Sequence, residues 1–279
     1  NDIHEFLATQ NVLKNGTIAL DKQTPGIEFE DVAFAYPGSE TSTGKSIFEK
    51  INFMIKPGEK IAIVGVNGAG KTTLTKLLMR FYDPTGGCVR IGGHDARNIE
   101  ISSYYKKIGY LSQEYDKFKM ITKDAIGIGD TSEPTDLPRV IEAAKRAGAH
   151  EFIQAWPHAY DTQLGNEFEG GIQPSIGQWQ KLALARLFYR DPQIRILDEP
   201  TASIDSVAEM EIFSELENLP ADKTVILISH RFNTVKNADK IMVVEDGQIK
   251  EFGNHTHLMA KENGVYRKLF TSQKESFAD

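Results

Sequence analysis

The chain of 279 residues contains one cysteine, Cys88, which excludes an intrachain disulfide bond and a thiolate metal cluster. No apolar run approaches the ~18 residues that a membrane-spanning helix needs, and no repeat or low-complexity tract occurs. The net charge of −7 disfavours a nucleic acid partner, because nucleic acid phosphates call for a basic surface. With 40% hydrophobic and 25% charged residues, the composition is that of an ordinary globular protein. The single cysteine fits a reducing, cytosolic environment.

Strand patterns and helical patterns alternate along most of the chain. Residues 27–34 and 48–55 alternate between apolar and polar side chains, which predicts two antiparallel strands. Residues from about 114 to 190 carry helical patterns and are expected to form a second lobe. Further strands are expected at residues 60–64, 88–91, 108–111, 194–197, 224–228 and 240–244, with a hairpin and a helix over 248–270. The sequence therefore predicts an α/β fold with a mostly parallel sheet flanked by helices.

The segment from Gly65 to Thr73 lies between a buried-strand pattern and a helical pattern. Its glycines let the backbone turn tightly and aim several N–H groups into one concavity, which the helix dipole reinforces. Lys71 can reach the β- and γ-phosphates of a nucleotide, and the Thr72 hydroxyl can bind magnesium. A glycine-rich turn without a ligand is the simpler alternative, but the complete pattern favours a nucleotide. The predicted nucleotide-binding residues of this loop are Gly65, Asn67, Gly68, Ala69, Gly70, Lys71, Thr72 and Thr73.

The predicted strand at residues 194–197 ends in two carboxylates, Asp198 and Glu199. Neighbouring parallel strands end at the same sheet edge, so we expect Asp198 beside the phosphate loop. There Asp198 can hold magnesium through a water molecule, and Glu199 can polarise the water that attacks the γ-phosphate. A solvated strand end is the alternative. Arg195 is unusual within a buried strand, so we expect that one face of the strand is partly open or that Arg195 is paired.

His230 follows the strand pattern at residues 224–228 and is expected at the same edge. It can donate a hydrogen bond to the γ-phosphate and position the attacking water. A lone histidine at a strand end is structural by default, but the company of the other candidate groups favours a catalytic role. The predicted catalytic residues are Lys71, Glu199 and His230.

With these motifs in this order, the chain resembles the ATP-binding-cassette (ABC) ATPases, and specifically the nucleotide-binding domains of exporters, over residues 27–270. The resemblance implies a P-loop NTPase core with an N-terminal antiparallel β subdomain and a helical signature subdomain. It implies ATP and Mg²⁺ as ligands, with Tyr36 stacked on adenine. Gln113 would contact magnesium together with Thr72 and Asp198, and Asp205 would lie in a loop that crosses to the opposing subunit.

The signature motif departs from the family pattern. The family has Leu-Ser-Gly-Gly-Gln, followed by any residue and Gln, at the start of a helix, whereas residues 174–180 read Pro-Ser-Ile-Gly-Gln-Trp-Gln. The resemblance implies that the retained Ser175, Gly177 and Gln178 contact the ATP of the partner subunit. Ile176 adds a β-branched side chain where backbone must approach phosphate, and it cannot easily take a positive φ. Ser175 can cap the helix or contact phosphate, and the sequence supports both roles equally.

An intact catalytic set beside an altered signature is the combination found in heterodimeric exporters. We hypothesise that the phosphate loop of this chain completes a competent site with the intact signature of a different chain, while its own signature caps an impaired site. A homodimer with two weakened sites is the runner-up. A non-transport ABC ATPase, such as a DNA-repair or translation ATPase, and a regulatory nucleotide-binding subunit with little hydrolysis remain as alternatives.

The first residue is not methionine, and we expect residues 1–26 to be a linker or the end of an upstream membrane domain. Residues 27–279 would be the nucleotide-binding domain, on the cytoplasmic face of the cell membrane. The expected partners are a transmembrane domain, in the same polypeptide or in another subunit, and a second nucleotide-binding domain, with no nucleic acid. The segments that resemble contacts of exporter coupling helices are Phe118, Ile126, Gly129 and residues 168–171.

Overall fold

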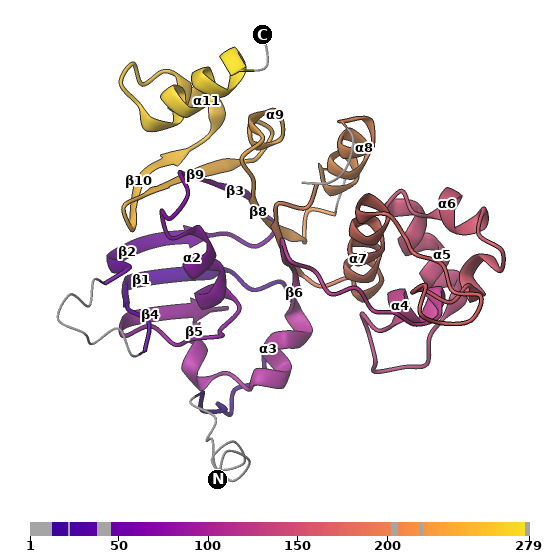
Figure 1. The fold of residues 1–279 in the computed structure, drawn as a ribbon. Helices are drawn as coiled ribbons and strands as arrows, with labels where there is room; N and C mark the ends of the chain where they lie inside the picture. Colours follow the sequence, from indigo (N-terminus) through magenta and orange to yellow (C-terminus); the bar gives the residue numbers. More distant parts are fainter. Residues whose placement is uncertain (1–12, 22, 38–45, 202–205, 218–219, 277–279) are drawn as a thin grey trace, which may run out of the picture.

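The computed structural model describes residues 13–21, 23–37, 46–201, 206–217 and 220–276. A central sheet lies between a smaller antiparallel sheet and a lobe of helices, which stand on opposite sides of it (Figure 1). The predicted fold class is confirmed, including the antiparallel β subdomain. Within the described residues, no helix is both long and apolar enough to span a bilayer.

The central sheet has six strands, and five of them are parallel. In spatial order they are β10 (Gln248–Gly253), β9 (Lys240–Glu245), β3 (Lys60–Val64), β8 (Thr224–Ile228), β7 (Ile194–Asp198) and β6 (Ile108–Leu111). β10 pairs antiparallel with β9. β7 and β8 are buried at every position, which is why their sequences are nearly continuous apolar runs.

The four-stranded antiparallel sheet covers one face of the central sheet. Its order is β2 (Phe48–Ile55), β1 (Ile27–Phe34), β4 (Gly86–Ile91) and β5 (His94–Asp95). The predicted antiparallel pairing of β1 with β2 is confirmed. Alternate residues of the central strands, such as Ile63, Ile196 and Ile226, share one apolar core with this sheet and with Leu74 of helix α2 (Lys71–Leu78). The core thereby fixes the helix that follows the phosphate loop.

Helices α4 to α7 form the lobe between β6 and β7. Their bounds are α4 (Thr122–Gly127), α5 (Leu137–Arg146), α6 (His150–Gln154) and α7 (Ile176–Arg190), with a 3₁₀ turn, η2, at Ala159–Asp161. Trp179 of α7 is buried in the apolar core of this lobe, which also includes Leu197 and Leu227 of the central sheet. The remaining helical segments are η1 (Ala96–Asn98), α3 (Ile101–Lys107), α8 (Ser206–Glu217), α9 (Phe232–Val235), α10 (His255–Met259) and α11 (Val265–Ser276).

Arg195 is paired, and neither face of its strand is open. The residue is fully buried in the middle of β7, and its guanidinium forms an ion pair with Asp191. Asp191 also accepts an ion pair from Lys223 at 3.0 Å. Of the two expectations for Arg195, the pairing is therefore correct, and it gives the buried charge a partner, which burial of an ion requires.

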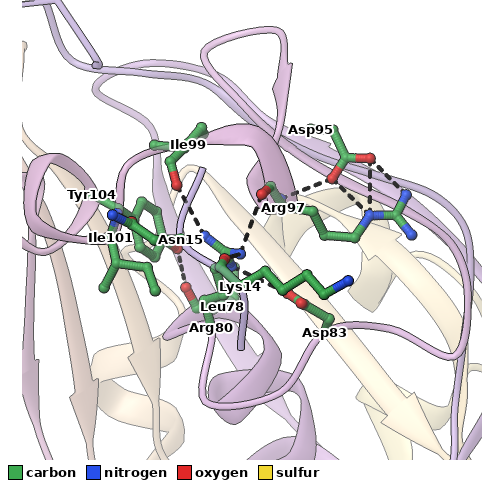
Figure 2. Close-up of polar contacts among 10 residues, drawn as sticks. All are labelled: Lys14, Asn15, Leu78, Arg80, Asp83, Asp95, Arg97, Ile99, Ile101 and Tyr104. Carbon is green, nitrogen blue, oxygen red and sulfur yellow. Dashed lines mark hydrogen bonds and ion pairs between the residues drawn. The ribbon is translucent and has the colours of Figure 1, made fainter. Parts of the chain in front are cut away.

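Arg80 joins the end of α2 to the segment at residues 14–18 (Figure 2). Its buried guanidinium donates to the Lys14 carbonyl at 2.8 Å and to the Ile99 carbonyl at 3.1 Å, and it pairs with Asp83 at 3.1 Å. Asn15 adds a hydrogen bond to the Ile101 amide at 2.8 Å. Part of the segment assigned to a linker is thus fixed to the same helix that begins at the phosphate loop.

Candidate functional site

The phosphate loop joins β3, which ends at Val64, to α2, which begins at Lys71. Gly68 and Gly70 have φ values of 80° and 109°, a region that favours glycine. A Cβ atom on Gly65 would lie 2.1 Å from the Val244 carbonyl oxygen, so no larger residue fits there. Of the other predicted residues of the loop, Asn67 and Thr72 are exposed, and Ala69 and Thr73 are buried.

Lys71 folds back over its own loop. Its Nζ atom donates to the Gly65 carbonyl at 2.7 Å and to the Val66 carbonyl at 3.0 Å. Burial lowers the pKa of Lys71, while the negative charges of Glu199 and Asp198 act in the opposite direction. The ammonium group therefore lies against the loop, and both carboxylates are near enough to act on its pKa.

Asp198 and Glu199 lie at the carboxyl end of β7, which pairs with β8 on one side and β6 on the other. Asp198 is 8% exposed, and burial followed by the charge of Glu199 raises its pKa. Tyr110 of β6 donates a hydroxyl hydrogen bond to Asp198 Oδ2 at 3.4 Å. Glu199 has a φ of 47°, a conformation that costs a non-glycine residue about 1–3 kcal/mol and is concentrated at functional sites.

His230 lies at the same edge, two residues after the end of β8. Its Nε2 atom is 3.2 Å from Glu199 Oε1, and the Glu199 amide donates to the Ile228 carbonyl at 2.9 Å. Burial and the positive charge of Lys71 lower the pKa of His230, which outweighs the opposite effect of Glu199. The lowered pKa favours the neutral form of His230, in which one ring nitrogen can donate a hydrogen bond to a phosphate.

Tyr36 lies beside α2. Its hydroxyl is 3.1 Å from Thr73 Oγ1, and the Lys76 ammonium lies 5.2 Å from the centre of its ring. The ring also packs edge-on against Phe34 and Tyr82. This cluster places a half-buried aromatic ring within one helical turn of the phosphate loop.

Gln113 is exposed just beyond the end of β6. Because Leu111 of β6 is in register with Leu197 of β7, Gln113 leaves the sheet at the edge where Asp198 lies. Asp205 falls outside the described residues. Of the segments expected to meet coupling helices, Ile126 is fully buried, whereas Phe168 is 45% exposed. Ile126 therefore has no exposed side-chain surface in this arrangement.

The altered signature forms the beginning of α7. Ser175 Oγ accepts a hydrogen bond from the Gln178 amide at 3.2 Å, and Gln178 Oε1 accepts one from the Ser175 amide at 2.9 Å. This reciprocal pair is a capping box, so the structural role considered for Ser175 is realised. Ile176 is the first residue of the helix, without a positive φ, and its side chain is 62% exposed.

Two residues near the site were given no role by the sequence. Tyr110 contacts Asp198, and Gln180 of α7 donates from Nε2 to the Glu199 carbonyl at 3.3 Å. Tyr110 lies on the strand before Gln113, and Gln180 lies on the helix that begins with the signature residues. The signal that could have identified them is a polar side chain within an otherwise buried segment, on a strand of the central sheet for Tyr110 and on the inner face of α7 for Gln180.

Comparison with known proteins gives consistent matches over nearly the whole chain. The family model described as ABC transporter matches residues 48–202. ABC transporter B family member 14 of Arabidopsis thaliana is 39% identical over 248 residues, which cover 89% of this chain and 19% of that protein. A Bacillus subtilis ATP-binding/permease protein, provisionally named for multidrug export, is 38% identical over 260 residues, 93% of this chain and 43% of that protein.

A solved structure of a bacterial Atm1-family ABC exporter with ATP bound superposes with a TM-score of 0.88 and 30% identity. The match covers 98% of this chain and 47% of that chain. This chain thus spans less than half the length of each of these three relatives.

Proposed function

The chain belongs to the ABC transporter family, and from that premise we propose that it is the ATP-hydrolysing motor domain of an exporter. The convergence of Lys71, Asp198, Glu199 and His230 on one sheet edge supports this function best. These residues come from the ends of three strands and carry the charges that phosphate binding and water activation need. Closure of two such domains around ATP would be transmitted to membrane helices and move them. Hydrolysis of the ATP would then let the two domains separate again.

In this proposal the phosphates lie on the loop of residues 65–73, and adenine stacks on Tyr36. Lys71 exchanges its contacts with the Gly65 and Val66 carbonyls for contacts with the β- and γ-phosphates. The charge of the phosphates favours the ammonium form that burial disfavours, so bound nucleotide would raise the pKa of Lys71. The loop leads directly into α2, whose N-terminus favours an anion.

Glu199 acts as the base in this proposal, and His230 senses the γ-phosphate. Glu199 Oε1 lies 3.2 Å from His230 Nε2, so one water molecule near this pair can contact both side chains. Neutral His230 donates a hydrogen bond to the γ-phosphate and holds the attacking water in line, while Glu199 accepts the proton that the water loses. The positive φ of Glu199 occurs at the residue that directly follows β7.

The residues at this edge fit a magnesium ion. Asp198 offers a carboxylate, Thr72 a hydroxyl and Gln113 an amide oxygen, which are the oxygen ligands that magnesium prefers. In the described part of the chain no cluster of three His, Cys, Asp or Glu side chains could hold a metal by itself. When bound with ATP, magnesium would neutralise negative charge on the β- and γ-phosphates.

We further propose that the partner is a different nucleotide-binding domain with an intact signature. Residues Ser175, Gly177 and Gln178 would face the ATP of that partner, where the exposed Ile176 side chain stands between the helix and the phosphates. Asp205 would belong to the loop that crosses to the partner. A transmembrane domain, in the same polypeptide or another subunit, would hold both domains at the cytoplasmic face of the membrane.

Phosphate release from the complete protein, alone and with candidate partners, tests these assignments. We expect slow hydrolysis by the protein alone and fast hydrolysis with a partner that carries the intact signature. Fast hydrolysis by a purified homodimer would rule out the heterodimer. ATP binding without hydrolysis in every combination would instead favour a regulatory subunit, which is the alternative that Ile176 supports.

A further inference from the structure

The carboxyl-terminal helix α11 contacts the loop that carries His230. Gln273, in the last turns of α11, donates from Nε2 to the backbone carbonyl of His230 at 2.5 Å. We propose that Gln273 is a positioning residue, which fixes His230 through its backbone and makes α11 part of the hydrolytic site. This inference rests on the role proposed above for His230.

α11 is itself held firmly at its first turn. Glu251 of β10 is 9% exposed, and its carboxylate accepts hydrogen bonds from the amides of Tyr266 at 2.9 Å and Val265 at 3.3 Å. A carboxylate that accepts from amides in the first turn satisfies donors that the helix leaves open, and it complements the helix dipole. The fully buried Tyr266 also contacts His255 Nδ1 through its hydroxyl at 2.8 Å.

Helix α11 packs against β3, the strand that leads into the phosphate loop. Tyr266 shares an apolar cluster with Ala62 and Val64 of β3, Val243 of β9 and Val235 of α9. α9, which Figure 1 labels, begins two residues after His230. α11 is thus fixed relative to both the phosphate loop and the His230 segment, and it can hold one against the other.

Gln273 donates its hydrogen bond to the carbonyl of the peptide group that follows His230. The orientation of this peptide group affects where the His230 imidazole lies. Along this segment, the Ser229 amide lies 3.5 Å from the Ile63 carbonyl, and the Arg231 amide donates locally to Ser229 Oγ at 3.0 Å. Fixing the His230 carbonyl limits rotation of the peptide group between His230 and Arg231. The His230 imidazole therefore stays 3.2 Å from the Glu199 carboxylate. Misplacement of a catalytic group by about 1 Å can cost on the order of 100-fold in rate.

The test compares variants of the complete protein assembled with its partner. Gln273→Met keeps the length of the side chain but removes the donor, and Gln273→Lys retains a donor. Ser272→Ala, at an exposed position one residue earlier on α11, is the matched control. His230→Ala tests the proposed function on which the inference rests. Each protein is assayed for kcat, for KM of ATP and for hydrogen–deuterium exchange of residues 229–235.

We expect Gln273→Met to lower kcat about three- to tenfold, the factor that one ordinary hydrogen bond corresponds to. KM for ATP and the exchange of residues 265–272 should stay unchanged, while exchange of residues 229–235 should rise. Gln273→Lys and Ser272→Ala should behave like the wild type in all of these measurements.

Wild-type turnover and exchange in Gln273→Met, alongside an inactive His230→Ala, would overturn the inference and leave the proposed function standing. Equal losses in Gln273→Met and Gln273→Lys would also overturn it, because the donor would then be irrelevant. Faster exchange throughout α11 would show a structural role instead. Full activity of His230→Ala would remove the proposed role of His230. Unchanged exchange of residues 229–235 in Gln273→Met would separately refute the proposal that Gln273 fixes the His230 backbone.

Discussion

Replacing Glu199 with glutamine tests the assignment of the base most directly. The amide has the same shape as the carboxylate, and its oxygen can still accept a hydrogen bond at the 3.2 Å distance that separates Glu199 from His230. Glutamine inherits the same left-handed backbone, with a φ of 47°. The strain of about 1–3 kcal/mol at such a position is therefore the same in both proteins. We expect the melting temperature of the variant to match that of the wild type.

The chemical step should suffer far more than binding does. A positioned general base contributes about 10²- to 10⁴-fold to the rate, which corresponds to roughly 2.7–5.4 kcal/mol of activation free energy. ATP should bind at least as tightly, because one negative charge near the phosphates disappears. Since the charge of Glu199 raises the pKa of Asp198 and of His230, both pKa values should fall in the variant.

Single-turnover phosphate release and equilibrium binding of a fluorescent ATP analogue separate these effects in the complete protein. Glu262→Gln, at an exposed position outside the site, is the control for the loss of one carboxylate. Wild-type hydrolysis in Glu199→Gln would refute the assignment of the base. Loss of ATP binding together with hydrolysis would show that Glu199 supports the nucleotide site and not the attacking water.

Three further outcomes follow from the structure. Ser175→Ala should lower the unfolding free energy by about 1 kcal/mol through loss of the capping box, seen as a melting point about 2–4 °C lower, whereas Ser175→Asp should retain the wild-type value. Gly65→Ala should lower ATP affinity at least about tenfold or prevent folding, since its Cβ would lie 2.1 Å from the Val244 carbonyl; binding and circular dichroism decide between the two. Asp198→Asn should abolish magnesium-dependent turnover yet raise the melting temperature of the nucleotide-free protein. Folding raises the pKa of Asp198, so this group favours the folded state only while protonated and costs stability at neutral pH.

The central sheet could be read from the sequence because burial on both faces leaves an unambiguous signal. The strands at residues 108–111 and 224–228 occur at the predicted positions. Residues 224–228 form a continuous run of β-branched and apolar side chains, which is typical of a strand buried on both faces. Helix α3 was not predicted. Its seven residues include one buried side chain, Tyr104, and that is too few for a recognisable helical period.

Some residues of the candidate site were predictable from the sequence, and others were not. Asp198 and Glu199 were predicted because they stand at the end of a strong strand pattern, and Lys71 because it ends the glycine-rich loop that follows another strand. Parallel strands bring such ends together. Gln273 was not predictable in this manner. Its partner is a backbone carbonyl 43 residues away in sequence, and neither end of that contact leaves a mark on the local pattern. Contacts between a side chain and a distant backbone atom become visible only once the packing of α11 is known.

One of the two reasons for expecting Ile176 to disturb the signature is wrong. Ile176 was expected to disturb the motif partly because it resists a positive φ, but residue 176 opens α7 without a positive φ. Its backbone is also held from the other side, as Tyr115 donates its hydroxyl to the Ile176 carbonyl at 2.9 Å. What remains is steric: a β-branched side chain, 62% exposed, stands at the helix N-terminus, where amide groups would otherwise be open to an anion. An impaired half-site would therefore arise from blocked approach on a correctly formed helix.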